Sequence, residues 1–247
     1  MTENDHTESV RRLFDAKADG WSAKYKPSSR PGAAPALAWR IDVFTRAVAD
    51  RCPAPARVLD FGCGTGDLAR AFAERGYEVT ACDLSEPMLA RAHAAFGDAV
   101  RWVALDAASP RLPFADGELD AVVASSVLEY VADPNAVLYE CARILRPSGL
   151  LVASVPQVRH PVRRLEAVAS AFVRLNNWLA GSRSRRWLAR VSPRAVNYAE
   201  YLRLSKNRYS CEDWVASAEH QGFEPVFSER GAKGASLEVL GFRRRRR

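Results

Sequence analysis

Residues Val58 to Ala69 read VLDFGCGTGDLA, and this stretch decides the fold. Apolar residues lead into Asp60, glycines follow at every second position from Gly62 to Gly66, and a helical pattern then begins. The pattern predicts a β-strand, a tight turn and the first turn of a helix. In an open α/β sheet a ligand binds at such a place, because glycine lets it approach the backbone closely.

The spacing of the glycines separates two kinds of ligand. A dinucleotide-binding turn has the pattern G-x-G-x-x-G, whereas this turn has G-x-G-x-G, with Asp67 where the third dinucleotide glycine would stand. Asp60 before the turn and Asp67 after it would repel a pyrophosphate. The turn therefore favours a cationic ligand that lacks phosphate, and S-adenosylmethionine, with its amine and its sulfonium, is such a ligand.

The stretch DFGCGTGDLA closely resembles the first motif of the class I S-adenosylmethionine-dependent methyltransferases. Two later phrases, LPFADGELDAV at residues 112–122 and LRPSGL at residues 145–150, are typical of the small-molecule, type-11-like branch of that family. The resemblance is strong over residues 56–157. It implies S-adenosylmethionine as the cofactor and methyl transfer as the activity, but it does not specify the acceptor. The alternative is a glycine-rich turn with only a structural role.

The chain alternates strand and helix patterns, which predicts an α/β fold of the Rossmann-like type: a seven-stranded, mostly parallel sheet with helices on both faces. Strands are expected at residues 57–61, 78–83, 100–105, 119–125, 150–155, 224–227 and 236–242, and helices at residues 8–18, 36–52, 67–75, 86–96 and 134–145. The resemblance implies that the last strand inserts antiparallel beside the fifth.

Four segments are expected along the chain. They are an N-terminal helical lid (1–55), the cofactor-binding core (56–157), a basic helical cap inserted between strands five and six (158–210), and the completion of the core with an arginine tail (211–247). The cap is predicted because an ordinary crossover would be about half as long as the connection after strand five.

The formal charge of +7 is unevenly distributed. Residues 159–194 carry +8 and residues 243–247 carry +5, which leaves −6 for the rest of the chain. This asymmetry suggests an anionic partner, and a solvated basic face is the alternative. The polar N-terminus, the lack of a 20-residue apolar run and five scattered cysteines favour a cytoplasmic protein with reduced thiols, without a signal peptide, a membrane span or a zinc site.

Acidic residues after the second and third strands are candidate cofactor ligands. Asp83 can accept the two ribose hydroxyls of an adenosine, and Leu84 and Met88 can pack on the adenine. The resemblance implies that Asp106-Ala107 reads the adenine edge, and that an aromatic residue and an arginine of the lid reach the methionine end. The full set expected to bind the cofactor is Tyr25, Arg40, Asp60, Gly62, Cys63, Gly64, Gly66, Asp83, Leu84, Met88, Asp106, Ala107 and Ser125.

Catalysis depends on alignment more than on a base. Positioning is worth effective molarities of ~10⁵–10⁸ M, whereas a general base adds ~10²–10⁴-fold. If the acceptor is a hydroxyl, His160 is the candidate base, with Tyr198 and Tyr201 of the cap as weaker ones. Glu129-Tyr130 stands where related enzymes often have Glu-His, which argues against carrying over a quinone-type or catechol-type acceptor.

Several acceptors agree with these features. A small molecule or glycan clamped by arginines ranks first, a lipid-linked acceptor reached by a cap lying on an anionic inner membrane surface ranks second, and RNA ranks third. A hypothesis of another class is a scaffold or nucleoside-binding protein that keeps the fold without catalysis. The sequence does not specify an oligomeric state.

Overall fold

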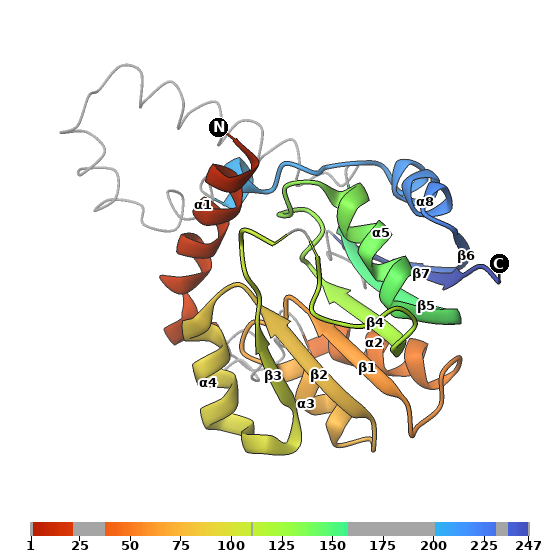
Figure 1. Ribbon diagram of the computed structural model, residues 1–247, viewed down its shortest axis with the longest axis horizontal. Helices are drawn as coiled ribbons and strands as arrows, with labels where there is room; N and C mark the ends of the chain where they lie inside the picture. The colour runs from red at the N-terminus through yellow and green to blue at the C-terminus, as the bar shows by residue number, and fades with distance from the viewer. Residues whose placement is uncertain (1, 22–37, 110, 158–200, 231–236, 247) are drawn as a thin grey trace, which may run out of the picture.

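The computed structural model of the chain describes residues 2–21, 38–109, 111–157, 201–230 and 237–246. Its strands form one sheet in the order β3-β2-β1-β4-β5-β7-β6 (Figure 1). The strands are β1 (Arg57–Phe61), β2 (Glu78–Asp83), β3 (Arg101–Ala104), β4 (Leu119–Ser125), β5 (Leu145–Pro156), β6 (Phe223–Arg230) and β7 (Leu237–Arg244). The predicted seven-stranded, Rossmann-like sheet is confirmed.

The sheet is parallel from β3 to β5, whereas β7 runs antiparallel to both of its neighbours, β5 and β6. The insertion of the last strand beside the fifth is therefore confirmed. The chain leaves β1 on one side towards β2 and returns on the other side as β4, so the strand order reverses at β1. A crevice for a ligand is expected outside the carboxyl ends of the strands at such a reversal.

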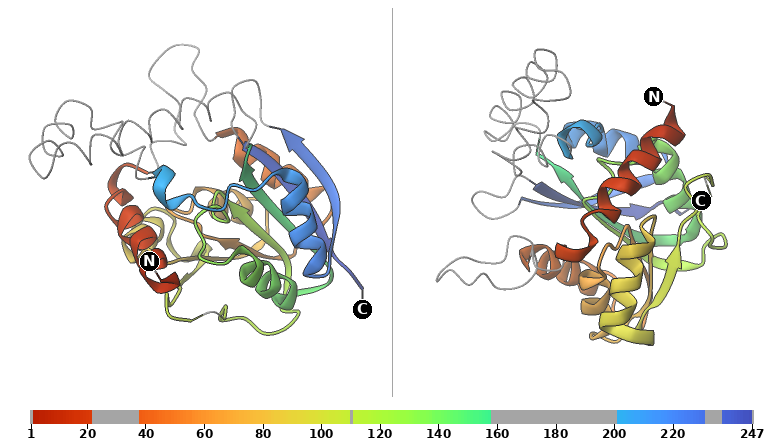
Figure 2. Two further views of the ribbon diagram at one scale, coloured as in Figure 1. Left: turned by 90° about the horizontal axis from the view of Figure 1, so that it is seen from above. Right: turned by 90° about the vertical axis from the view of Figure 1, so that its left-hand side faces the viewer.

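The described helices cover both faces of the sheet (Figure 2). They are α1 (Glu3–Asp15), η1 (Ala18–Gly20), α2 (Ala38–Ala49), α3 (Asp67–Ala73), α4 (Glu86–Phe96), η3 (Gly97–Ala99), α5 (Pro134–Ile144) and α8 (Cys211–His220). Within the described ranges, no helix is both long enough and apolar enough to cross a bilayer.

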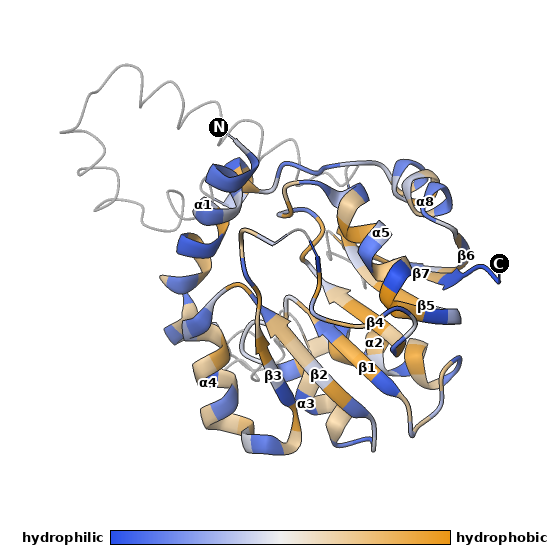
Figure 3. Cartoon of the chain, viewed as in Figure 1, coloured by the Kyte–Doolittle hydropathy of each residue, from blue (hydrophilic) through white to orange (hydrophobic). Residues whose placement is uncertain are grey.

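The two faces of the sheet are separated by the two-residue repeat of the strands. Leu59 and Phe61 pack in the core beneath α5 and α8, while Val58 packs in the core beneath α2 and α3. Figure 3 shows the strands as mainly hydrophobic, as expected for a sheet covered on both sides. The core therefore holds the strands in register, and their carboxyl ends share one edge.

The lid helix α1 was predicted to begin near Glu8, and this is wrong. The helix begins at Glu3, because Thr2 and Asp5 form a capping box. The Asp5 amide donates to Thr2 Oγ1 at 3.2 Å, and the Thr2 amide donates to the Asp5 carboxylate at 2.9 Å. The extra turn carries the helix further along the edge at which the strands end.

Strand β5 also begins earlier than its predicted start at Leu150. It starts at Leu145, which pairs with Leu119, and the register shifts before the next pair. Ser148 has φ +64°, and a Cβ on Gly149 would lie 2.8 Å from the carbonyl oxygen of Arg146. Residues 145–149 thus form an irregular first part of β5, which the sequence pattern does not include in the strand.

Candidate functional site

The glycine turn joins β1 to α3 and requires glycine for steric reasons. Gly62, Gly64 and Gly66 all have positive φ, at +71°, +54° and +77°. A Cβ on Gly62 would lie 2.4 Å from Val127 Cγ2, and one on Gly66 would lie 2.6 Å from Trp102 Cη2. The turn therefore packs tightly against its neighbours and exposes bare backbone at the end of the strand.

Backbone hydrogen bonds tie this turn to the end of β2. The amides of Gly62 and Cys63 both donate to the carbonyl of Cys82, at 2.8 and 3.0 Å. The Gly64 amide donates to Asp83 Oδ2 at 2.8 Å, and the Ser85 amide donates to Asp83 Oδ1 at 2.9 Å. Asp83 thus has a fixed orientation beside the turn. Burial raises the pKa of its carboxyl, and the hydrogen bonds from the backbone amides oppose this rise.

Asp60 is a buried acid near the end of β1, and the Ala69 amide of α3 offsets only part of the rise in pKa that burial causes. Its side chain is 1% exposed, and neither carboxylate oxygen has a hydrogen-bond partner among the described residues. Burial, and secondly the charge of Asp83, raise the pKa of Asp60 from 3.8 to about 8. A buried carboxyl of this kind beside bare backbone fits a ligand that brings a cationic donor group.

The acid after the turn, Asp67, contributes to the raised pKa of Asp60 only as a neighbouring charge. Thr65 Oγ1 donates to Asp67 Oδ2 at 2.7 Å, and Asp67 is not among the residues that line the cavity described below. Of the two acids that flank the turn in the sequence, Asp60 lines the cavity and Asp67 does not. Asp60 and Asp83 are the two acids near the turn that line the cavity, and this pair makes the site acidic.

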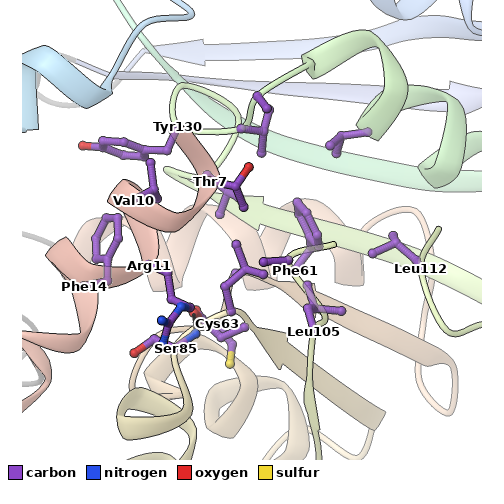
Figure 4. Close-up of a pocket in the computed structure, with 18 of the residues that line it drawn as sticks. Thr7, Val10, Arg11, Phe14, Phe61, Cys63, Ser85, Leu105, Leu112 and Tyr130 are labelled. Carbon is purple, nitrogen blue, oxygen red and sulfur yellow. Dashed lines mark hydrogen bonds between the residues drawn. The ribbon is translucent and has the colours of Figure 1, made fainter. Parts of the chain in front are cut away.

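A cavity of about 560 Å³ opens above the turn (Figure 4). Most residues expected to bind a cofactor line it: Arg40, Asp60, Gly62, Cys63, Gly64, Asp83, Leu84, Met88, Asp106, Ala107 and Ser125. Gly66 does not line the cavity but precedes the first residue of α3. Tyr25, His160 and Tyr198 lie outside the described residues, as do residues 158–200 of the predicted cap.

Helix α1 supplies side chains to the cavity wall that the sequence analysis did not name as site residues. Figure 4 shows Thr7, Val10, Arg11 and Phe14 projecting from this helix towards the cavity. Three of them, Thr7, Val10 and Phe14, recur at helical spacing. The periodicity of this segment therefore indicates a helix with one face that packs. The periodicity alone does not indicate which surface this stripe of side chains covers.

Arg11 is held at this wall by carboxylates of its own helix. Its Nε and Nη2 donate to the two oxygens of Glu8 at 2.8 Å each, and Nη1 donates to Asp15 Oδ2 at 3.1 Å. The guanidinium of Arg11 lowers the pKa of Glu8 to about 2. Both carboxylates partly neutralise the arginine, so the acidic character of the cavity floor is preserved.

The lid helix is attached to the loop after β4. His6, which is 1% exposed, donates from Nε2 to the carbonyl of Tyr130 at 2.8 Å. The Phe14 ring meets the Tyr130 ring edge-on, with centroids 5.4 Å apart. Tyr130 therefore packs on Phe14 and also lines the cavity. The loop after β4 thus links the floor of the site to its lid.

The arginine tail lies at the other end of the sheet. Because β7 is antiparallel to β5, Arg243 pairs with Leu150 near the amino end of β5. Arg246 Nε donates to Ser148 Oγ at 2.9 Å at the same end. The cavity opens at the carboxyl ends of the strands. The described part of the tail is thus remote from the cavity and does not line it.

The strand order, the glycine turn and the acid at the end of β2 together define the fold of the class I S-adenosylmethionine-dependent methyltransferases. A family model described as "Methyltransferase domain" matches residues 59–153, so the core of the chain is a domain of this family.

Curated relatives and solved structures agree with this assignment. The chain is 31% identical over 171 residues to a ubiquinone biosynthesis O-methyltransferase of Xanthomonas oryzae pv. oryzae, covering 68% of this chain and 64% of that protein. It is 40% identical over 146 residues to a demethylmenaquinone methyltransferase of Clavibacter sepedonicus, covering 56% and 58%. The chain therefore spans less than two thirds of the length of these relatives.

Among solved structures, the fold is similar to that of a Burkholderia thailandensis 1,6-didemethyltoxoflavin-N1-methyltransferase with bound S-adenosylhomocysteine. The TM-score is 0.65 at 19% identity, and the match covers 100% of this chain and 92% of that one. At this identity the likeness supports the fold, while the acceptor has to be argued from the site.

Proposed function

We propose that this protein transfers a methyl group from S-adenosylmethionine to an oxygen or nitrogen atom of a small molecule or glycan. The observation that carries the proposal is the meeting of three features in one cavity: bare glycine backbone, the oriented Asp83 and the buried Asp60. When bound, S-adenosylmethionine would supply a methyl group: a lone pair of the acceptor attacks the methyl carbon in line with the carbon–sulfur bond, this bond breaks, and the sulfur leaves as a neutral thioether.

Each end of the cofactor has candidate partners in the chain. Asp83 accepts the ribose hydroxyls, and the fixed Gly64 and Ser85 amides keep its carboxylate oriented for them. Asp106 and the Ala107 amide receive the adenine edge, with Leu84 and Met88 against the ring. These assignments follow from position along the strand ends together with their place in the cavity lining.

The amino-acid end of the cofactor needs one anionic and one cationic partner. Asp60 receives the ammonium, which would favour the ionised form of this carboxyl and lower its pKa. Arg40 receives the carboxylate, since it lines the same cavity. Ser125 at the end of β4 stands where the methyl group and the acceptor must meet.

In this proposal the cavity positions the reacting groups. Alignment accounts for the larger part of the rate, as the magnitudes given above show. A base is needed only where the acceptor loses its proton during the reaction, and His160, with Tyr198 as a second choice, stays the candidate. The cap, residues 158–210, would then form the acceptor side of the site.

A lipid-linked acceptor on an anionic membrane surface is the second candidate, and RNA ranks below it. The arginine-rich segment 159–194 is the reason for considering both a membrane and RNA. The described tail arginines lie at the opposite end of the sheet from the cavity and therefore support neither of these acceptors. A cytoplasmic location suits the first candidate. A catalytically inactive nucleoside-binding protein is the hypothesis of another class.

Calorimetric titration with S-adenosylmethionine and with S-adenosylhomocysteine tests the proposal. The wild-type protein is expected to bind both at micromolar concentration. Asp83→Ala should weaken both by about 10- to 100-fold, because one charged hydrogen-bond acceptor contributes about 1.5–3 kcal/mol. If the wild-type protein binds neither ligand, the proposal is wrong. If it binds both but methylates nothing in a metabolite screen scored by cofactor turnover, the inactive hypothesis is preferred.

A further inference from the structure

The loop after β4, residues 126–133, starts in a backbone conformation that favours glycine. Ser126 has φ +59°, and its amide donates to Ser154 Oγ on β5 at 2.9 Å. Ser154 is fully buried, and Ser126 lines the cavity, as do Tyr130 and Val131 further along the loop. A residue other than glycine persists in this conformation only where its surroundings hold it there. The loop that forms this wall of the cavity is therefore held from its first residue.

Asn207 binds three carbonyls of this loop. Its Nδ2 donates to the carbonyls of Leu128, at 2.9 Å, and Val131, at 2.7 Å. Its backbone amide donates to the Glu129 carbonyl at 3.2 Å, and the carbonyl of Tyr130 accepts from the lid as described above. Four consecutive carbonyls of the loop are thus held by two residues outside it. A carboxamide has two N–H donors, and Asn207 uses both on the loop.

Asn207 itself does not line the cavity. Its exposed fraction is 4%, and neither Asn207 nor any other described residue after Glu140 is among the residues that form the cavity lining. The loop is neither helix nor strand, so its carbonyls have no partners in a regular ladder. Without the carboxamide, two of them would lose their donor, and the loop would gain other conformations. Asn207 therefore determines where the cavity-lining side chains of the loop lie.

The segment that carries Asn207 also packs on the lid. Leu204, which is fully buried, forms a small hydrophobic cluster with Val10 and Leu13 of α1, apart from the two cores on the faces of the sheet. Figure 1 shows the first residues of this segment, in light blue, beside α1. Residues 201–207, near the end of the predicted cap, thus contact both the lid and the loop.

We infer that Asn207 is a positioning residue: it holds the loop after β4 in the conformation in which the side chains of the loop meet the bound cofactor. The inference rests on the proposed function and deepens it. A ligand that needs this conformation stabilises it, and by linkage it also stabilises the contacts of Asn207 with the loop. Ligand binding in the cavity should therefore affect residues 201–207, none of which lines the cavity.

Calorimetry with S-adenosylhomocysteine measures the effect of Asn207 on binding. Asn207→Leu removes both donors at similar volume, and Asn207→Asp replaces the amide nitrogen by an oxygen with little change in shape. Each variant is expected to raise the dissociation constant by about 3- to 30-fold, because only a fraction of the molecules then holds the loop in the binding conformation.

Ser205→Ala is the matched control for this measurement. Ser205 is buried in the same segment, with an exposed fraction of 6%, but the four loop carbonyls have their donors in Asn207 and in the lid. The alanine variant should preserve the dissociation constant of the wild-type protein.

Amide hydrogen exchange with and without S-adenosylhomocysteine gives a readout that a merely structural asparagine would not change. In the wild-type protein the ligand should slow local exchange in the loop and in residues 201–207, relative to α8, which follows this segment. In the Asn207 variants the slowing at residues 201–207 should be lost, while that in the glycine turn, residues 62–66, remains.

Thermal unfolding establishes that each variant is folded, and the exchange comparison on the wild-type protein needs no variant. If folded variants bind the ligand as the wild-type protein does, the inference is wrong. It is also wrong if the ligand leaves exchange at residues 201–207 unchanged in the wild-type protein, or if the slowing there persists in the variants. If the wild-type protein binds neither S-adenosylhomocysteine nor S-adenosylmethionine, the proposed function fails first, and the role of Asn207 with it.

Discussion

The floor and the lid of this cavity are built in different ways. The floor is a glycine turn whose amides donate to Cys82 and Asp83, the last two residues of the neighbouring strand. The lid is a helix held by side chains, through the His6 bond to Tyr130 and the packing of Phe14. A floor made of backbone tolerates little change in conformation, whereas a side-chain contact can be loosened without altering the strands. Three substitutions sharpen this contrast.

Gly62→Ala should have the largest destabilising effect, because it strains the floor twice. The alanine must adopt φ +71°, and its Cβ would collide with Val127. Together these effects should lower the free energy of unfolding by about 2–4 kcal/mol, measured by urea unfolding. Gly76→Ala is the control, since Gly76 has φ +84° but open space around it. Equal losses in the two variants would mean that the floor is not tightly packed.

Asp60→Asn should remove a dependence of stability on pH. The pKa of Asp60 is raised from 3.8 to about 8 in the folded chain, so the folded state binds more protons between these values. The contribution of Asp60 is therefore fully present below about pH 4 and is lost as the pH rises through 8. Relative to the wild-type protein, the free energy of unfolding of the asparagine variant should rise by about 3–4 kcal/mol between pH 5 and pH 8 without ligand.

Unfolding in urea at three pH values measures this difference. Groups that titrate in both proteins cancel in the comparison. If the difference in unfolding free energy between the two proteins stays constant from pH 5 to pH 8, Asp60 does not bind a proton in this range. Its surroundings would then be more hydrated than the 1% exposure of Asp60 indicates.

His6→Ala should have the smallest effect, and it should be local. It removes the bond to the Tyr130 carbonyl and leaves that acceptor unpaired, at a cost of about 1 kcal/mol. Amide hydrogen exchange should speed up in α1 and remain unchanged in α3. His93→Ala is the control, because His93 is an exposed helix residue. Equal acceleration in both helices would show that the lid and the floor open together.

The same contrast explains what could be predicted from the sequence. The floor is local: strand, turn and acid lie within about 25 residues, and each has its own residue pattern. The strands β1 and β2, and the positions of Gly62 and Asp83 at their ends, were therefore predictable. The lid depends on contacts such as that between His6 and Tyr130, which are 124 residues apart. No local pattern specifies such a pair. Amphipathic spacing showed that α1 packs, but not what it covers.

The different positions of Asp60 and Asp67 relative to the cavity have a physical explanation of the same kind. Asp67 follows the turn directly and looked equivalent to Asp60 in the sequence. Its carboxylate instead accepts a hydrogen bond from Thr65, two residues earlier. Such a local bond satisfies a carboxylate at little cost, whereas Asp60 lies on a buried strand without such a neighbour. The local hydrogen bond of Asp67 thus explains why its carboxylate stays beside Thr65, while that of Asp60 lines the cavity.

The antiparallel position of β7 has a consequence for synthesis of the chain on the ribosome. Strand β5 lies inside the finished sheet, yet one of its edges is covered only by residues 237–244, about 80–90 residues later in the chain. A nascent chain that has completed β1 to β5 therefore presents a long apolar strand with unpaired amides and carbonyls. Such an edge is a template for association with other chains, so the growing polypeptide depends on its last strand for protection during translation.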